Sequence, residues 1–255
     1  MKFAGIIAEY DPFHNGHAWQ LAQAKALGAE RVAVAMSCSL VQRGALPLLP
    51  EAVRTRSALT CGADLVFALP APCACAGAEA FARAGVALLA AAGCDGLVFG
   101  AETPDAALLM ETAELLDSGS YRAALKAQLA GGSRSFAAAR QAAAAQLASD
   151  ERVAALLDKP NNNLAVEYCR AIRSLAPRME AYPLPRQGAN HGEALHSAHG
   201  QFASASALRK LWAEGGADAV APYVPEAVFP LYQEAYAAGQ YTDFSAAGRC
   251  ELALL

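Results

Sequence analysis

Two histidines that flank a glycine are the residues of this chain best suited to chemistry. The motif His14-Asn15-Gly16-His17 directly follows a short apolar run and opens a segment with helical spacing. The start of a helix carries free backbone N–H groups and partial positive charge, which attract phosphate, and a glycine lets the backbone approach a ligand closely. Two imidazoles at this place can donate hydrogen bonds to phosphate oxygens as charge develops during a displacement. We therefore interpret His14 and His17 as catalytic groups for transfer at a phosphate, which needs no protein nucleophile.

The competing interpretation is that both histidines are ordinary polar residues of a loop. A single histidine would favour that interpretation. A pair around a glycine, placed directly after an N-terminal strand, favours the functional one, because the motif is informative only in that context.

Alternating strands and helices are expected to position this motif. Short apolar runs predict four strands, at 3–9, 31–36, 64–69 and 96–99, and helical patterns lie between them at 16–27, 51–61 and 77–92. Such alternation predicts an α/β fold with a parallel sheet and right-handed crossovers. Ligands of these sheets bind at the carboxyl ends of the strands, so the segments of interest are 10–17, 37–44, 70–79 and 100–103.

The remainder of the chain is mainly helical in pattern. Residues 104–157 are rich in alanine and predict a helical insertion, and 161–175 and 204–212 predict two further helices on either side of a last strand at 179–184. We expect residues 1–103 and 158–215 to form the main domain, with 104–157 inserted into it. Residues 216–255 are expected to begin a helical C-terminal part that is cut short.

Composition excludes several classes of protein. The net charge of -4 argues against a surface coated in positive charge, although Arg170, Arg173, Arg178 and Arg186 could form a local basic patch or simply lie on a solvated helix. The seven cysteines form no disulfide framework and are expected to be reduced. The N-terminal apolar run is too short for a signal segment, and the apolar stretch at 73–94 contains Glu79 and Arg83, so we expect a cytoplasmic protein without a membrane span.

The sequence around the two histidines also resembles a known family. Gly5 to His17 reads G-I-I-A-E-Y-D-P-F-H-N-G-H, which is typical of the H-x-G-H nucleotidyltransferase superfamily and, in its length, similar to the tRNA(Met) cytidine acetate ligase family. Further blocks follow in the family's order, and ordered blocks are more specific than any one of them. These blocks are Met36-Ser37, Val41–Gly44, Gly62–Val66, Leu69-Pro70, Phe99–Glu102, Pro160–Tyr168, Arg186–Gly188 and Ala203–Lys210.

The resemblance implies a fold and an activity. The fold would be Rossmann-like, with a parallel sheet, a helical insertion and a C-terminal helical part. The activity would be that of a ligase that uses ATP, with its Mg²⁺, to activate acetate as acetyl-adenylate and then acetylates N4 of the wobble cytidine of elongator tRNA(Met). Two alternatives are a small-molecule adenylyltransferase of the pantetheine-phosphate or nicotinamide-mononucleotide type and a catalytically silent nucleotide-binding regulator.

The resemblance also assigns residues to the ATP site. They are Ile7, Ala8, Glu9, Tyr10, Asp11, Pro12, Phe13, His14, Asn15, Gly16, His17, Gln20, Gly100, Asn161, Asn162, Arg186, Ser204, Ser206 and Arg209. Several have a purely structural alternative: Asn161, Asn162 and Ser204 could be helix N-caps, and Gly100 could be a strand-end turn. Glu102 could hold Mg²⁺ through water or could be a first-turn helix carboxylate. A metal site at His191, His196 and His199 is not favoured, because no cysteine or carboxylate pattern supports it.

Two residues depart from the family's pattern. Asp11 stands where the family usually has asparagine, and a carboxylate near a triphosphate is repulsive unless metal or arginine pairs with it. Glu51 stands where the family tends to have a lysine, ahead of the arginine matched by Arg54. Family members usually continue beyond the length of this chain, which puts binding of the tRNA in question.

Overall fold

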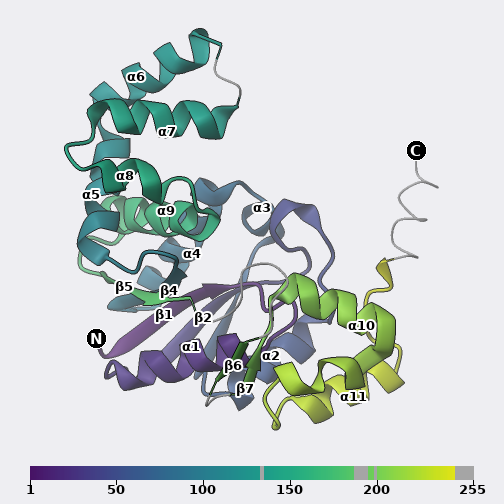
Figure 1. Ribbon diagram of the computed structural model, residues 1–255. Helices are drawn as coiled ribbons and strands as arrows, with labels where there is room; N and C mark the ends of the chain where they lie inside the picture. Colours follow the sequence, from purple (N-terminus) through teal and green to yellow (C-terminus); the bar gives the residue numbers. More distant parts are fainter. Residues whose placement is uncertain (133–134, 187–194, 198–199, 245–255) are drawn as a thin grey trace. The chain divides into compact units, whose positions relative to one another are not determined.

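The computed structural model describes residues 1–132, 135–186, 195–197 and 200–244 (Figure 1). The chain divides into two compact units, one formed by Met1–Gly77 and Gln187–Leu255 and the other by Ala78–Arg186. The domain division expected from the sequence, with boundaries at 103/104, 157/158 and 215/216, stays a prediction.

Three parallel strands and the helices between them form the centre of the first unit. Strand β1 pairs with β2, and β2 pairs with β3, with Ala4 opposite Val32 and Ala33 opposite Leu65. The elements are β1 (Phe3–Ala8), α1 (Asn15–Ala26), β2 (Arg31–Ser37), a 3₁₀ turn η1 (Gln42–Gly44), α2 (Glu51–Thr60), β3 (Leu65–Leu69) and a short α3 (Ala71–Ala74). The strands run parallel because a helix returns the chain between each pair.

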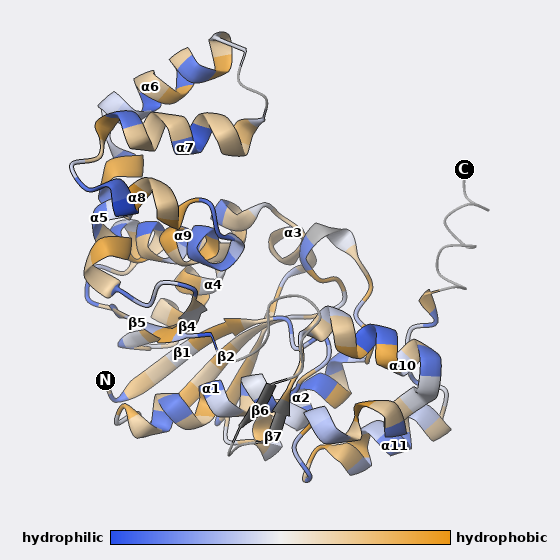
Figure 2. Ribbon diagram, in the orientation of Figure 1, coloured by the Kyte–Doolittle hydropathy of each residue, from blue (hydrophilic) through white to orange (hydrophobic). Residues whose placement is uncertain are grey.

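The apolar residues of these strands form the core. Figure 2 shows β1 and β2 mostly in hydrophobic colours, and residues 32–36 are almost completely buried. A strand that is buried on both faces reads as a continuous apolar run, which is why these segments could be recognised in the sequence.

The C-terminal part of the first unit is helical. Its elements are two short antiparallel strands, β6 (Leu195–Ser197) and β7 (Gly200–Phe202), then α10 (Ala205–Val220), a 3₁₀ turn η2 (Ala221–Tyr223) and α11 (Phe229–Ala237). Gly216 interrupts α10 with φ +69°, and a Cβ there would lie 2.6 Å from the ring of Tyr236. This close approach lets Trp212 pack edge-on against Tyr232 and Tyr236.

The described residues of the second unit form two strands and six helices. They are α4 (Ala78–Ala91), β4 (Gly96–Ala101), α5 (Ala106–Asp117), α6 (Gly119–Ala130), α7 (Phe136–Leu147), α8 (Glu151–Leu156), α9 (Pro160–Leu175) and β5 (Glu180–Pro185). Strands β4 and β5 are parallel, α4 and α5 pack on α9, and α6 lies against α7. The predicted helical character of residues 104–157 is confirmed.

Within the first unit the strand order is β3-β2-β1, and within the second unit β4 pairs with β5, all in parallel. This arrangement confirms the predicted α/β class with a parallel sheet. Three features were not predicted: α3, the β6–β7 pair, and the continuation of α10 beyond Trp212 to Val220. None of the helices in the described ranges is both long and apolar enough to cross a bilayer.

Candidate functional site

The two histidines of the motif form a reciprocal cap at the start of α1. His14 is the N-cap residue, and its Nδ1 accepts a hydrogen bond from the backbone N–H of Gly16 at 3.0 Å. The Nδ1 atom of His17 accepts from the backbone N–H of His14 at 3.3 Å. Both histidines therefore have a structural role, because they satisfy N–H groups that a helix start would otherwise leave without a partner, and their catalytic role stays a prediction.

Capping also fixes the orientation and the tautomer of the two rings. The imidazoles stack with centroids 3.8 Å apart and planes 21° apart. Tyr10 and Phe13 hold His17 from other sides, with ring centroids at 4.8 and 5.6 Å. An Nδ1 atom that accepts a hydrogen bond carries no proton, so the neutral ring carries its proton on Nε2. Each imidazole thus has Nε2–H as its donor, at the positive end of a helix dipole.

Gly16 is required by the position of the His14 ring. A Cβ at residue 16 would lie 2.9 Å from Cε1 and 3.1 Å from Nδ1 of His14. Any other side chain would displace the ring or break its bond to the backbone. The glycine therefore serves the histidine as well as any ligand that approaches the helix.

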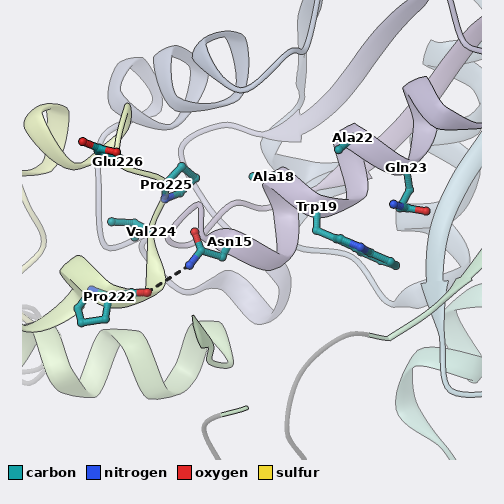
Figure 3. A pocket seen from close by; sticks show the side chains of 9 residues that line it. All are labelled: Asn15, Ala18, Trp19, Ala22, Gln23, Pro222, Val224, Pro225 and Glu226. Carbon is teal, nitrogen blue, oxygen red and sulfur yellow. Dashed lines mark hydrogen bonds between the residues drawn. The ribbon is translucent and has the colours of Figure 1, made fainter. Parts of the chain in front are cut away.

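The other predicted residues of this segment lie between the end of β1 and the middle of α1. Ile7 and Ala8 end β1, Asp11 and Pro12 are joined by a cis peptide bond, and Gln20 lies in α1. Asn15 is buried, and its Nδ2 donates to the carbonyl of Pro222 at 3.2 Å, which ties the start of α1 to η2 (Figure 3).

Asp11 is paired in the way that its position requires. The side chain is only 4% exposed. Its Oδ1 accepts from the backbone N–H of Leu48 at 2.6 Å, and its Oδ2 accepts from Nη1 of Arg209 at 3.0 Å. The same Nη1 donates to the Asp11 carbonyl at 2.7 Å. The expected repulsion is offset by an arginine, which is itself one of the predicted site residues.

The two predicted serines lie at the start of α10. Ser204 is the N-cap, and its hydroxyl accepts from the backbone N–H of Ala207 at 3.2 Å. The hydroxyls of Ser204 and Ser206 are 3.0 Å apart. The N-cap alternative for Ser204 is therefore confirmed, and the exposed Ser206 hydroxyl lies beside it.

Arg54 is a buried arginine that the sequence analysis did not include among the site residues. Arg54 has no exposed surface, and its guanidinium donates to four carbonyls rather than to a carboxylate. The acceptors are the carbonyls of Leu49 at 3.0 Å, Glu9 at 2.7 Å, Ser37 at 2.7 Å and Cys38. Arg54 therefore fastens the carboxyl ends of β1 and β2 to the loop before α2, and burial lowers its pKa.

Glu9 is the second charged group at the end of β1. Its Oε1 accepts from the backbone N–H of Gln42 at 2.6 Å, which ties η1 to the motif. Burial raises the pKa of Glu9 and the nearby Asp11 adds to the increase, while the Gln42 bond and the charges of Arg209 and Arg54 oppose it.

The second unit holds the remaining predicted residues at the ends of its strands. Gly100 is in β4, and a Cβ there would lie 3.5 Å from Cγ of Arg186. The backbone N–H of Arg186, directly after β5, donates to the carbonyl of Ala101 at 3.2 Å. Gly100 is therefore part of a strand and not a turn, and the Arg186 stem covers it.

The asparagines predicted as a helix cap are not the cap. Lys159 is the N-cap of α9 and provides no side-chain bond. The Glu102 carboxylate instead accepts from the backbone N–H groups of Asn161 at 3.2 Å and Asn162 at 2.7 Å, and from Nδ2 of Asn161 at 2.6 Å. Burial alone would raise the pKa of Glu102, but these hydrogen bonds outweigh it and lower the pKa. Glu102 is therefore not in the first turn of a helix; it follows β4, and its carboxylate binds the first turn of α9, a helix distant in sequence.

Asn162 is held differently from Asn161. Its side chain is buried, its Oδ1 accepts from the backbone N–H of Thr103 at 2.9 Å, and its Nδ2 donates to the Thr103 hydroxyl at 3.2 Å. The side chain of Asn161 is only half-buried. Asn161 is therefore the more accessible of the two.

Two of the arginines that could form a basic patch are neutralised. Arg170 contacts Asp117 and Glu167 at 2.8 and 2.7 Å, and Arg173 contacts Glu114 at 3.2 Å. Glu167, only 3% exposed, also binds Arg140. The structure contradicts a basic patch at Arg170 and Arg173, because carboxylates surround both. Gln187, Gly188, His191 and His199 lie outside the described residues.

A pocket of about 440 Å³ lies along α1 in the first unit (Figure 3). Trp19 and Gln23 extend into it from the helix, and Val224, Pro225 and Glu226 come from the segment after η2. Its lining, all within the described chain, contains no cationic side chain, so the pocket is not suited to phosphate. No three His, Cys, Asp or Glu side chains converge on a possible metal position anywhere in the described ranges.

Helix α1 thus begins with the histidine-capped H-x-G-H motif, directly after the parallel strand β1. A family model described as HIGH Nucleotidyl Transferase matches residues 1–252. The chain belongs to this family. The matched range includes the motif His14-Asn15-Gly16-His17.

Individual relatives of this HIGH nucleotidyltransferase carry a more specific name. A protein of Syntrophotalea carbinolica named tRNA(Met) cytidine acetate ligase is 41% identical over 84% of this chain and 52% of its own length. One of Caldanaerobacter subterraneus with the same name is 35% identical over 94% of this chain and 60% of its own. The chain thus spans about half to three-fifths of the length of these curated relatives. The predicted resemblance to that group is confirmed.

Solved structures agree with the sequence comparison. Thermotoga maritima TmcAL bound with alpha-thio ATP superposes on this HIGH nucleotidyltransferase with a TM-score of 0.84 at 30% identity, covering 94% of this chain and 57% of that one. The apo form of the same protein gives a TM-score of 0.86 at 31% identity. The predicted nucleotidyltransferase fold is therefore confirmed.

Proposed function

We propose that this chain is the nucleotidyltransferase portion of an ATP-dependent tRNA(Met) cytidine acetate ligase. The proposal assigns two half-reactions. Acetate attacks the α-phosphorus of ATP, the bond to the β-phosphate breaks, and acetyl-adenylate and pyrophosphate form. N4 of the wobble cytidine of elongator tRNA(Met) then attacks the acetyl carbon, AMP leaves, and the amine loses a proton. Relatives of this name and a related structure bound with alpha-thio ATP support it.

One observation carries the proposal: both motif histidines use Nδ1 to bind backbone and therefore have Nε2–H as donor. Displacement at the α-phosphorus builds negative charge on oxygen, and preorganised N–H donors at a helix N-terminus stabilise that charge. The chain's own contribution is positioning and charge stabilisation, as nucleotidyl transfer requires.

The remaining predicted residues receive roles within each unit. In the first unit, residues Ile7 to Gln20 would surround the triphosphate, and Ser206 would donate to the β- and γ-phosphates beside the cap residue Ser204. In the second unit, Gly100 and Arg186 would receive the adenosine. Asn161 would contact the nucleotide, and the buried Asn162 would support it through Thr103.

Magnesium would enter with ATP. The described residues offer no cluster of three ligands, and the Glu102 oxygens are occupied by the start of α9. Mg²⁺ commonly keeps several waters and binds through substrate phosphates, so this arrangement fits a metal carried mainly by the nucleotide. The ion would neutralise charge on the triphosphate.

Recognition of tRNA is assigned to the whole ligase. The net charge of -4 and the neutralised Arg170 and Arg173 offer little attraction for a phosphate backbone. We place the reaction in the cytoplasm, where tRNA and ATP are available, and expect no role for a membrane.

ATP–pyrophosphate exchange with Mg²⁺, with and without acetate and in the absence of tRNA, tests the proposal. Exchange that depends on acetate is the expected result. ATP binding without acetate-dependent exchange would overturn the assignment of the first half-reaction to this chain. Adenylyl transfer to a phosphorylated acceptor, without a response to acetate, would replace it by a small-molecule adenylyltransferase.

A further inference from the structure

Asp11 and Arg209 join the motif to α10 across 198 residues of sequence. The Asp11 carboxylate contacts two elements at once, through Leu48 in the loop before α2 and through Arg209 in the first turns of α10. Among the described residues, Arg209 forms hydrogen bonds only through Nη1, and both go to Asp11. The geometry points to Arg209 as a positioning residue that acts on the H-x-G-H segment through Asp11, rather than as a ligand of the phosphates. This inference rests on the proposed function.

The acceptor pattern explains why a carboxylate is needed. Each Asp11 oxygen accepts from a different donor, the Leu48 N–H and the Arg209 guanidinium. Asparagine offers only one oxygen, so its NH₂ would face one of these donors and one bond would be lost. Asparagine, the residue that the family usually has, would keep the bond from Arg209 to the carbonyl of residue 11 but could accept only one of the two bonds that the Asp11 carboxylate accepts. The Asp11 carboxylate therefore holds the Leu48 N–H and the Arg209 guanidinium at the same time.

Burial makes the pairing strong enough to position other groups. Asp11 is 4% exposed, and the Arg209 side chain is 33% exposed. A charge-assisted bond to a carboxylate so shielded from water is stronger than a surface ion pair. Asp11 lies three residues before His14, so a shift of Asp11 moves the residue that caps α1. Through the same bond, Ser204 and Ser206 at the start of α10 are held in register with the motif.

A double-mutant cycle of Asp11→Asn, Arg209→Gln and the combined variant tests this pairing, with Lys210→Gln as the control. Lys210 is exposed and lies next to Arg209, so its replacement removes the same charge without the pairing. Without ATP, each single variant should lower the thermal midpoint by roughly 5 °C, and the double variant should lower it no further than the worse single variant. Additive losses would overturn the pairing, whatever the chain's activity.

The role of Arg209 is tested by binding and by hydrogen exchange. Arg209→Gln should accelerate amide exchange at Leu48, which Arg209 does not bond, and should lower acetate-dependent exchange of pyrophosphate far more than it weakens ATP binding. A direct phosphate ligand would give the opposite result: a rise of about tenfold or more in the Kd for ATP when Arg209→Gln is introduced, both into the unmodified chain and into the Asp11→Asn variant. If the unmodified chain binds no ATP while the stability coupling is present, the proposed function fails and the pairing stands.

Discussion

His14 and His17 each accept a backbone N–H through Nδ1, at 3.0 and 3.3 Å, while their rings stack 3.8 Å apart. The same side chains thus build the helix start and provide the Nε2–H donors proposed for catalysis. A test of the motif must separate these two contributions, because loss of a helix cap can imitate loss of a catalytic group.

Replacing His14 by asparagine achieves this separation. Asparagine is a good N-cap, so the stability of α1 should be retained, but the Nε2–H donor is removed. We expect acetate-dependent ATP–pyrophosphate exchange to fall by about 10²–10³-fold with little change in the Kd for ATP, since the donor acts in the transition state. His14→Ala should show the same loss of exchange and also lose about 1 kcal/mol of stability. The exchange assay measures activity, and calorimetry measures the Kd for ATP. Full exchange activity in both variants would remove His14 from the mechanism.

A methyl group at Gly16 should displace the His14 ring. The added Cβ would lie 2.9 Å from Cε1, so the ring must leave its bond to the Gly16 N–H. A displacement of about 1 Å in a catalytic group costs on the order of 100-fold in rate, which is the loss expected in the exchange assay for Gly16→Ala. Gly119→Ala is the control, because nothing lies within 4 Å of its Cβ position. Equal activity of the two variants would contradict this account of Gly16.

Arg54 should be among the residues most costly to replace. Arg54→Met leaves four carbonyls without their donor in a buried place, and breaking such a network costs about 3–5 kcal/mol. Arg56→Met, two residues along the same helix, removes only an exposed ion pair with Glu234 and should change the free energy of unfolding by less than about 1 kcal/mol. Urea unfolding of both variants checks this. Similar midpoints would show that the Arg54 hydrogen bonds do not stabilise the ends of β1 and β2.

Glu102 should make the stability of the second unit depend on pH. Because its folded pKa is lowered, its contribution is fully present above the ordinary pKa of a glutamate and is lost as the pH falls through the folded pKa. At neutral pH, Glu102→Gln should cost roughly 0.5–1 kcal/mol, since the residue is exposed and the charge is screened. Melting curves of both proteins should converge in acid. A difference that persists at low pH would mean that the charge of Glu102 is not what stabilises α9.

Local patterns in the sequence predicted the elements but not their long-range partners. The strands at 3–9 and 31–36 are close to β1 and β2, because apolar runs and their boundaries are local signals. The Ser204 cap was considered for the same reason, since it bonds three residues ahead. Glu102 and Asn162 are 60 residues apart, and Asp11 and Arg209 are 198 apart. Composition and periodicity contain no information on such pairs, so the sequence could offer only the asparagines themselves as a possible cap of α9.

The Glu102 carboxylate and the Thr103–Asn162 bonds also join the two chain positions between which α5 to α8 emerge. These bonds hold together the two ends of the segment that contains α5 to α8. Evolution can lengthen or shorten the region between these positions without moving the end of β4 or the start of α9. Positions 102 and 161–162 should therefore covary among homologues, while the number of residues separating them varies freely.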